Sequence, residues 1–443
     1  MIKLSDHFKF STLIRFTLPS IAMMVFTSIY GVVDGFFVSN FVGEVEFTAV
    51  NFIMPFIMML GGIGFMFGTG GCALIAKTMG EGDGEKAKRQ FSLVVYTSAL
   101  VATLLAIIGI IFLPKVASLL GATGAMLENC VTYGRVVLIA LPALFYQFEF
   151  QSFFVAAERP KLGLITMLAA GITNMVLDAL FMAVFGWGIV GAAMATALSQ
   201  CVAGIIPLFY FATTKTSVLR LVPLHFDGKA LLYTCTNGSS ELLSNISMSL
   251  VGMLYNAQLL RYAGEQGVSA YGVLMYVNFV FLSVFIGFSV GSAPLISYHY
   301  GAQNHAELKN LFKKSTLFIL GTSILMLCAA ELLCTPLSAL FVGYNEELLA
   351  ITVRGFRIFS FSFLFAGLAI YGSSFFTALN NGAISALISF LRTLVFQVLA
   401  VLLLPLVMPV PLDGIWLSVV VAEFVAAALS GILMLALRRK YRY

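Results

Sequence analysis

The sequence predicts an all-α integral membrane protein of twelve transmembrane helices, arranged as two homologous six-helix bundles. Three observations predict this fold: a strongly apolar composition, twelve long apolar runs, and a second half that repeats the first. Of the 443 residues, 60% are hydrophobic and 10% are charged, and the mean hydropathy is +0.99. These values lie far outside the range of water-soluble domains, so the chain belongs in a bilayer.

The helices are predicted from apolar runs of about 20 residues, the length that crosses a bilayer. The first run is too long for the apolar core of a signal peptide, and no small-residue cleavage site follows it, so we expect it to be retained as the first helix. The twelve runs are residues 12–39, 48–77, 90–113, 128–152, 162–185, 188–211, 231–259, 268–297, 313–335, 348–376, 383–407 and 413–437.

The orientation is predicted from the basic residues, which concentrate in short cytoplasmic loops. Placing the N-terminus in the cytoplasm puts 19 of the 25 Lys and Arg on that side and only Lys115 and Arg261 outside. We therefore expect a multi-pass protein of the inner (plasma) membrane with both termini cytoplasmic. The net charge of +5 then reflects this topology and contact with anionic lipid, and it does not imply nucleic acid.

Four arginines fall within the apolar runs, near an end, where a long side chain can reach the interface. We interpret all four in this way; they are Arg135, Arg354, Arg357 and Arg392.

An internal repeat divides the chain. The segment "GTGGCALIAKTMGEGDGEKAKRQF" (68–91) returns as "SVGSAPLISYHYGAQNHAELKNLF" (289–312), with Gly70 falling on Gly291 and Gly80 on Gly301. Six helices separate the copies, so both have the same orientation and are related by an axis along the membrane normal. We expect an N-terminal lobe (1–211), a cytoplasmic linker (212–230) and a C-terminal lobe (231–443), with a central cavity between the lobes.

Two acids deep in the first lobe have no counterpart in the second. Asp34 falls near Met253 and Asp178 falls on Val401 in the repeat. At about 1.5 Å per residue, both acids lie roughly 24 to 30 Å from the cytoplasmic face. A charge at such depth costs at least about 2.5 to 3.5 kcal/mol, which favours a functional role. Since two nearby carboxylates cannot both ionise easily in a low dielectric, the pair is suited to carrying a proton.

Other polar residues are expected near these acids. Asn174 shares a helix face with Asp178, and Tyr30 shares one with Asp34. Thr196 lies about 12 Å from the outer face, again at 1.5 Å per residue. The sequence therefore predicts one polar pocket in the outer half of the membrane.

The second lobe has polar residues of its own at depth, and they are candidates for its side of the cavity: Glu241, Gln397 and Glu423. A single buried acid can also simply hydrogen-bond a neighbouring helix, so these residues are weaker candidates than the acid pair. The glycine pairs Gly31 with Gly35 and Gly64 with Gly68 predict close helix packing.

Nothing in the sequence supports an enzyme or a resident cofactor. The four histidines are scattered, and the chain has no H-E-x-x-H, G-x-S-x-G or Walker A pattern. The "GEGD" at 80–83 fits the motif of intramembrane aspartyl proteases but falls in a basic cytoplasmic loop. We therefore expect no enzymatic activity, no cofactor and no metal beyond a coupling ion.

Three segments carry a resemblance to a known family. "LPSIAMMVFTSIYGVVDGFFVSNFVG" (18–43), "NMVLDALFMAVFGWGIVGAAMATALSQ" (174–200) and "SYHYGAQN" (297–304) resemble signatures of the multidrug and toxic compound extrusion (MATE) family. The resemblance covers nearly the whole chain. It implies the family's fold and the export of cationic, amphipathic compounds in exchange for protons or Na⁺.

Several positions resemble one branch of the family in particular, the DinF-like branch. It implies that Pro19 is the proline at which the first helix bends, and that four residues bind the coupling proton or Na⁺: Asp34, Asn174, Asp178 and Thr196. The chain departs from the NorM-like branch, since its tenth helix has Arg354 and Arg357 but no acid.

The sequence therefore predicts a secondary active antiporter that works by rocker-switch alternating access. The alternative is a flippase for a lipid-linked saccharide or another lipid-like substrate of the same superfamily, for which cavity arginines and often fourteen helices are expected. The expected partners are the lipid bilayer and small organic cations or amphipathic compounds, with no nucleic acid, and the protein is expected to be a monomer.

Overall fold

A computed structural model describes residues 2–443, with all side chains except those at positions 36, 39, 40 and 44, and every regular element in this part of the chain is a helix. The helices extend the predicted runs by a few residues at each end, until a cap or turn stops them. At Asp83, for example, the side chain accepts a hydrogen bond from the amide of Lys86 and starts a helix, and Gly121, with φ 111°, ends it.

The elements follow in chain order. They are α1 (Phe10–Phe41), α2 (Glu44–Gly80), α3 (Gly84–Leu120), α4 (Gly124–Ile139), α5 (Leu141–Ala156), α6 (Pro160–Asp178), the π-helix η1 (Ala179–Val184), α7 (Gly188–Thr213), α8 (Gly228–Gly301), α9 (His305–Val342), α10 (Glu346–Ser360), α11 (Ser362–Ala378), α12 (Gly382–Phe390), the π-helix η2 (Leu391–Val395), α13 (Phe396–Val407) and α14 (Pro411–Tyr441).

The expected number of spans is confirmed. Within residues 2–443, nine helices are long and apolar enough to cross a membrane, and two bent pairs, α4 with α5 and α10 with α11, bring the total to eleven. One of the nine, α8, has 74 residues and breaks at Gly264, where φ is 61° and ψ is −156°. Its length of about 111 Å exceeds twice the roughly 30 Å of a hydrocarbon core. Counting α8 as two spans gives the predicted twelve.

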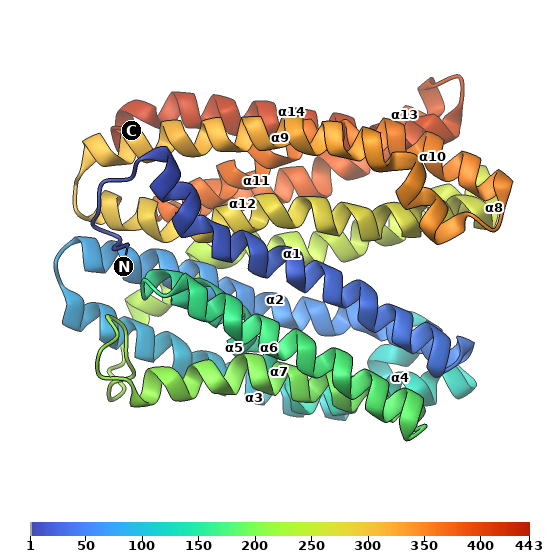
Figure 1. Cartoon of the computed structure of the whole chain (residues 1–443), viewed down its shortest axis with the longest axis horizontal. Coiled ribbons are helices and arrows are strands. Elements are labelled where there is room, and N and C mark those ends of the chain that lie inside the picture. Colours follow the sequence, from blue (N-terminus) through green and yellow to red (C-terminus); the bar gives the residue numbers. More distant parts are fainter. Residues whose placement is uncertain (1) are drawn as a thin grey trace.

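The helices lie side by side along the longest axis of the molecule. Figure 1 shows α3, α6 and α7 on one side of the bundle and α9, α13 and α14 on the other. Both chain termini lie at the same end of the bundle, which we call the termini end; the opposite end is the far end. For brevity, α1–α7 are called the first half and α8–α14 the second half.

Close contacts between the halves are made by the repeated glycines. A Cβ on Gly80 would overlap the carbonyl oxygen of Tyr298, and one on Gly301 would overlap that of Lys77. The repeat-related ends of α2 and α8 therefore cross backbone to backbone. Likewise, Gly70 packs against the first part of α8, and Gly291 packs against α1. Only glycine permits so close an approach, which is why both copies of the repeat carry it.

The apolar cores differ between the two ends. At the termini end, one core joins Leu4 and Phe8, which precede α1, and Val155 of α5 to residues of the second half, including Phe288 and Leu308. Toward the far end there are two separate cores. One lies among α1 to α7, and the other among α8 to α14. The halves are thus packed together near the termini and have independent cores further along.

The predicted glycine packing is confirmed for one pair and wrong for part of the other. A Cβ on Gly64 or Gly68 would lie 2.8 or 2.9 Å from the Cα of Phe145 or Glu149, so α2 and α5 are in close contact. A Cβ on Gly31 would meet nothing within 4 Å. A Cβ on Gly35 would lie 3.6 Å from the Tyr276 hydroxyl, an ordinary contact with a side chain.

Residues 2–9, which we call the N-terminal strap, join the two halves at the termini end. The Leu4 amide donates to Oε1 of Glu158, in the α5–α6 loop, at 2.7 Å. The Phe8 amide donates to Oε1 of Glu307 on α9 at 2.9 Å, and Nδ1 of His7 lies 2.5 Å from Oε2 of the same residue. Burial raises the pKa of the Glu158 carboxyl. The strap therefore bonds a loop of the first half and a helix of the second.

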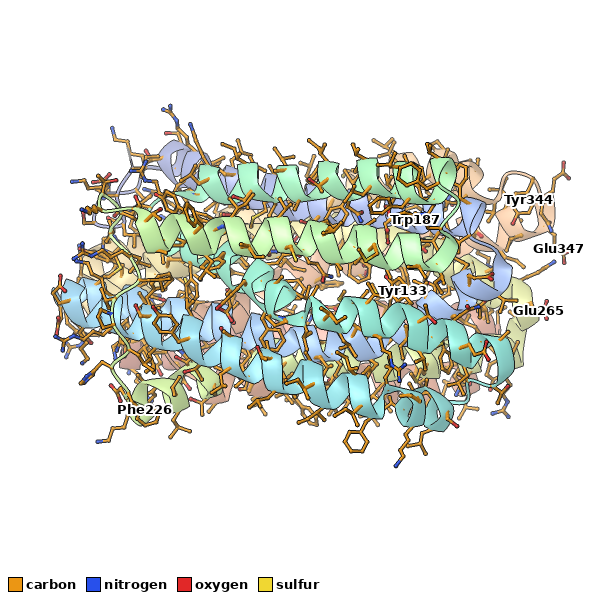
Figure 2. The ribbon with its side chains drawn as sticks, turned by 90° about the horizontal axis from the view of Figure 1, so that it is seen from below. Tyr133, Trp187, Phe226, Glu265, Tyr344 and Glu347 are labelled. Carbon is orange, nitrogen blue, oxygen red and sulfur yellow. The ribbon has the colours of Figure 1, made fainter. Side chains whose placement is uncertain are left out.

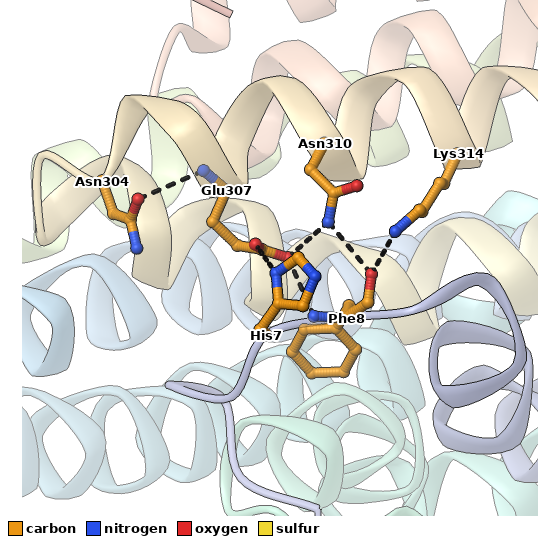
Figure 3. A network of polar contacts seen from close by, with 6 residues as sticks. All are labelled: His7, Phe8, Asn304, Glu307, Asn310 and Lys314. Atoms are coloured by element: carbon orange, nitrogen blue, oxygen red, sulfur yellow. Dashed lines mark hydrogen bonds and ion pairs between the residues drawn. The ribbon is translucent and has the colours of Figure 1, made fainter.

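Two side chains of the second half also donate hydrogen bonds to a carbonyl oxygen of the strap. Asn310 Nδ2 and Lys314 Nζ donate to the Phe8 oxygen at 3.0 and 2.6 Å, and Asn310 also donates to Glu307 (Figure 3). The side chains of Leu4 and Phe8 are fully buried. The start of α1 is thus anchored on α9, although the rest of that helix packs with both halves.

Candidate functional site

The structure brings the predicted acid pair together. Asp34 lies on α1, and its side chain lies beside those of Asp178 and Asn174 on α6. Asp178 is 0% exposed and Asn174 is 2% exposed, while Asp34 is half-buried. Asp178 is the last residue of α6, directly before the π-helix η1. A π-helical turn often marks a functional site, because it redirects side chains at the cost of weaker backbone geometry.

Tyr30 and Thr196 lie at the edge of this cluster. Tyr30 lies close enough to Asp34 for an electrostatic interaction and also beside Gln147 of α5. Thr196, on α7, lies beside the hydroxyl of Tyr133. The five residues predicted to form one polar pocket therefore come from α1, α6 and α7 and do converge on one region.

Two residues of the site were not predicted. Tyr133, on α4, is 1% exposed and lies within electrostatic range of both Asp34 and Asp178. Figure 2 places it among the helices, on the side of the molecule where Glu265 and Glu347 mark the far end. The other is Gln147. Both polar residues interrupt the apolar run 128–152, a signal from which they could have been found.

The oxygens of the site lack hydrogen-bond donors. Among the described residues, no donor bonds either carboxylate oxygen of Asp178, Oδ1 of Asp34 or Asn174, or Oγ1 of Thr196, and all of these atoms are buried. A buried polar atom left unsatisfied costs about 1 to 3 kcal/mol, more when it is charged. Natural proteins keep such groups where a proton, an ion or water satisfies them, so the cluster is built to receive one of these.

The chemistry of the cluster limits what it can hold. Its donors are two carboxylates, an amide carbonyl and a hydroxyl, all hard oxygen atoms that suit a proton or a hard cation. The residues therefore fit the predicted choice between H⁺ and Na⁺. In the described part of the chain, no group of three or more His, Cys, Asp or Glu is arranged to hold a metal ion.

In the second half, two of the three candidate residues are engaged by neighbouring side chains. The Tyr255 hydroxyl donates to Oε1 of Gln397 at 2.7 Å and lies 2.7 Å from the Ser418 hydroxyl. Nε of Arg392 donates to both carboxylate oxygens of Glu423, at 3.1 and 2.8 Å. Glu241 lies on α8 and is partly exposed.

Our interpretation of Arg392 was wrong. Its side chain is 15% exposed and is paired with the buried Glu423 instead of extending to the interface. The carboxylate on α14 supplies a closer and stronger partner than water at the membrane surface. Arg354, by contrast, is 60% exposed and pairs with Asp413 at 2.5 Å.

Pro19 lies within an unbroken α1 and is buried. Directly after it, α1 touches the second half: a Cβ on Gly287 of α8 would lie 2.6 Å from the Cα of Ile21 and 2.8 Å from the carbonyl oxygen of Ser20. Proline has no amide to bond the preceding turn, so the helix is weakest here. The weak point of α1 therefore lies next to a close contact with α8.

Twelve spans, a repeat that relates the two halves, and a buried acid pair with unpaired oxygens together define a polytopic membrane transporter. The family model described as MatE matches residues 19–180 and 242–402, one match in each half. The chain belongs to the MATE family of membrane transporters, which confirms the resemblance seen in the sequence.

Curated relatives and solved structures agree with this assignment. The chain is 26% identical over 370 residues to the multidrug export protein MepA of Staphylococcus saprophyticus, covering 81% of each chain. It is 24% identical over 435 residues to the MepA of Staphylococcus haemolyticus, covering 97% of this chain and 94% of that one. These relatives are transporters, so the expectation that the protein is not an enzyme is confirmed.

Two solved structures show the same fold. A crystal structure of MATE in complex with MaL6 superposes with a TM-score of 0.91 at 21% identity, covering 96% of both chains. The second is an outward-facing conformation of a multidrug resistance MATE family transporter of the MOP superfamily. It superposes with a TM-score of 0.91 at 20% identity, covering 96% of both chains. The predicted fold class is therefore confirmed.

Proposed function

We propose that the protein is a secondary active antiporter that exports cationic or amphipathic drugs or metabolites in exchange for protons or Na⁺. The observation that carries this proposal is the cluster of Asp34, Asp178, Asn174 and Thr196, whose buried oxygens lack donors among the described residues. A site that must bind and release an ion in every cycle needs such unsatisfied oxygens. The multidrug export activity named for the MepA relatives supports the choice of substrate.

The proposed orientation places the termini end in the cytoplasm of a monomer in the inner (plasma) membrane. The lobes are the predicted residues 1–211 and 231–443, joined by the linker at 212–230. The shared core and the crossing of Gly80 with Gly301 close the bundle at its cytoplasmic end, and the separate cores lie toward the outside. This arrangement supports a state in which the cavity opens outward. Rocker-switch exchange then requires the halves to separate at the termini end.

Coupling is proposed to act through α1. Asp34 lies about 22 Å along the helix from Pro19, at 1.5 Å per residue. When Asp34 takes up a proton or a cation, the charge in the acid cluster changes, and with it the packing of α1 on α6. Since the same helix is weak at Pro19 and contacts Gly287 just beyond, that change can bias the contact between the halves.

The alternative flippase function has less support. A saccharide diphosphate carrier needs free positive charge in its cavity, but Arg392 is neutralised by Glu423. The chain also has twelve spans, in place of the fourteen often found in such flippases. We therefore favour the export of organic cations, with Gln397 acting as a structural partner of Tyr255 and Glu241 as the candidate cavity residue of the second half.

Dye uptake into inverted membrane vesicles, whose cytoplasmic face points outward, tests the proposal. A pH gradient and a Na⁺ gradient are imposed separately, and the rate of dye movement is compared with that of vesicles without the protein. We expect at least one gradient to drive transport and Asp34→Asn to abolish the effect. Transport that ignores both gradients, or that survives Asp34→Asn unchanged, would contradict antiport at this site.

A further inference from the structure

A groove with a volume of about 580 Å³ lies at the far end of the second half, where Figure 1 shows α10. Its wall is formed mainly by α10, with Thr335 of α9 and Asp413 of α14 beside it. Thr335 is the last residue of one predicted apolar run, and Asp413 is the first residue of another. The groove therefore lies at the boundary between hydrocarbon and lipid headgroups. The proposed antiport mechanism makes no use of it.

One face of α10 forms the floor of the groove. The lining residues follow two rows with four-residue spacing, 346–350–354–358 and 349–353–357, which share one side of a helix. The opposite side of α10 is buried in the second half. Four of the lining residues are apolar, namely Leu349, Ala350, Val353 and Ile358, and three are charged, namely Glu346, Arg354 and Arg357. An apolar floor that carries charges suits an amphipathic ligand such as a phospholipid.

Asp413 has one carboxylate oxygen to spare. Nη2 of Arg354 donates to its Oδ2 at 2.5 Å. Its other oxygen, Oδ1, is buried and accepts no hydrogen bond from any residue in the described range 2–443. Buried polar atoms of native proteins are normally satisfied, and this one belongs to a residue that lines the groove. A donor bound in the groove would supply the missing hydrogen bond.

Arg357 supplies the opposite charge. Its side chain is exposed, and it forms no ion pair within the described part of the chain. The nearby acid of α9, Glu331, is already engaged by the Ser360 hydroxyl. Arg357 follows Arg354 by three residues, so it lies on the same side of α10 and about 4.5 Å further along the helix, toward the membrane interior. A guanidinium group in this position is suited to binding a phosphate through two hydrogen bonds.

We propose that this groove binds a phospholipid with a primary-amine headgroup, whose ammonium donates to Asp413 and whose phosphate accepts from Arg357. The order matches that of a lipid, since the ammonium is outermost, the phosphate lies deeper, and the lining residue furthest along α10, Ile358, is apolar. The lipid belongs to the leaflet at the far end, which the proposed orientation places outside.

The same residues disfavour other common headgroups. A choline headgroup has no N–H to donate to Oδ1 of Asp413, so that oxygen would stay unsatisfied. An anionic headgroup without an amine, such as that of phosphatidylglycerol, would meet the carboxylates of Asp413 and Glu346 with no positive charge of its own to offset them. Phosphatidylethanolamine is therefore the expected ligand among these three lipids.

Quenching of tryptophan fluorescence by brominated lipid tests this proposal. Trp416 follows Asp413 by three residues, and a Cβ on Gly355, between the two arginines of α10, would lie 2.8 Å from its ring. The other tryptophan is removed by Trp187→Phe. The full-length protein is placed in vesicles of brominated phosphatidylcholine that contain rising fractions of unbrominated phosphatidylethanolamine, phosphatidylglycerol or phosphatidylcholine with matched chains. We expect phosphatidylethanolamine to relieve quenching as a ligand bound about tenfold more tightly than phosphatidylcholine.

Substitutions in the groove assign the two contacts. Arg357→Gln should remove the roughly tenfold preference for phosphatidylethanolamine, because the phosphate loses its partner. Asp413→Asn removes a negative charge and leaves both arginines unpaired, so the preference should pass to phosphatidylglycerol. Arg135→Gln is the matched control: Arg135 is the counterpart of Arg357 in the repeat and is also exposed, but it lies on α4 of the first half. It should leave the lipid preference unchanged.

Several results would overturn the proposal. Equal relief of quenching by phosphatidylethanolamine and phosphatidylcholine would show that the groove does not select this headgroup. A preference that survives Arg357→Gln would place the lipid elsewhere, and stronger relief by phosphatidylglycerol in the parent protein would indicate a simple anion site. If Asp413→Asn does not fold, Arg357→Gln still decides the matter, because that side chain is exposed. Failure of antiport is seen separately, since these measurements use no ion gradient.

Discussion

The backbone amide of Phe8 donates a 2.9 Å hydrogen bond to Oε1 of Glu307, a residue 299 positions further along the chain. This bond ties the start of α1 to the start of α9. The Leu4 amide, four residues earlier, bonds Glu158 in the first half. Any motion that separates the halves at the termini end must therefore break one of these attachments or carry the strap with it.

We predict that Glu307→Gln shifts the protein toward states open at the termini end. The substitution replaces a carboxylate that accepts hydrogen bonds from Phe8, His7 and Asn310 with an uncharged amide. A hydrogen bond to a charged group contributes about 1.5 to 3 kcal/mol to stability. The population of closed protein should fall by at least about tenfold relative to open protein. Spin labels on the exposed Lys86 and Lys309 would report the distance between the two halves.

Glu85→Gln is the matched control for this prediction. Glu85 is an acid at the same end, but its partner, Lys88, lies within the same helix, so its loss should leave the distance distribution unchanged. Identical distributions for Glu307→Gln and the wild type would show that the strap does not hold the halves together.

We predict that Asp34→Asn and Asp178→Asn each abolish gradient-driven export and leave expression largely intact. A neutral isostere lowers the cost of burial but cannot take up and release a proton, and it weakens a cation site. The measurement is efflux from vesicles, with protein amount determined in the membrane fraction. Loss of the protein from the membrane would instead point to a structural role for the pair.

Glu331→Gln serves as the control for the acid pair. Glu331 is also an acid in a membrane helix, but it accepts a hydrogen bond from the Ser360 hydroxyl, and a glutamine oxygen can accept the same bond. We expect nearly normal export. A defect as large as that of Asp34→Asn would place part of the coupling in the second half.

We predict that Pro19→Ala retains substrate binding but slows turnover. The alanine restores an amide that bonds the preceding turn, so bending α1 at this position becomes more costly while the cavity is unchanged. Dye affinity at equilibrium and the initial rate of efflux separate the two effects. Pro114→Ala in α3 is the control, and equal turnover of Pro19→Ala and the wild type would remove bending at Pro19 from the mechanism.

We predict that Gly287→Ala destabilises the closed arrangement of the termini end. The new methyl group would lie 2.6 Å from the Cα of Ile21, and backbone atoms cannot move aside as a flexible side chain can. Such overpacking costs about 1 to 3 kcal/mol. We expect a lower thermal unfolding midpoint and a longer distance between labels on Lys86 and Lys309.

Gly252→Ala is the control for the packing effect, since a Cβ at that position would meet nothing within 4 Å. It lies on α8 before the break at Gly264 and should be close to neutral. Unchanged stability and unchanged label distance in Gly287→Ala would mean that α1 can move away from α8 without consequence, contrary to the proposed role of this contact.

Only part of the polar pocket could be predicted from the sequence. Asp34 and Asp178 were found because a carboxylate within an apolar run is conspicuous, and Asn174 and Tyr30 because residues four apart share a helix face. Tyr133 and Gln147 were missed because tyrosine and glutamine occur in many membrane helices without functional meaning. Only the packing of α4 and α5 against α2 and α7 brings Tyr133 beside the acids and Gln147 beside Tyr30.

The sequence by itself determined the bilayer environment, the twelve spans, the two related halves and the acid pair, because these depend on local hydrophobicity, run length and repetition. The tertiary structure alone decided that Arg392 pairs with Glu423 and that residues 2–9 bridge Glu158 and Glu307. These partners lie on different helices, loops or the strap, 31 to 299 residues apart. No local pattern specifies which faces of such distant helices will meet, since that is settled only when all twelve pack together.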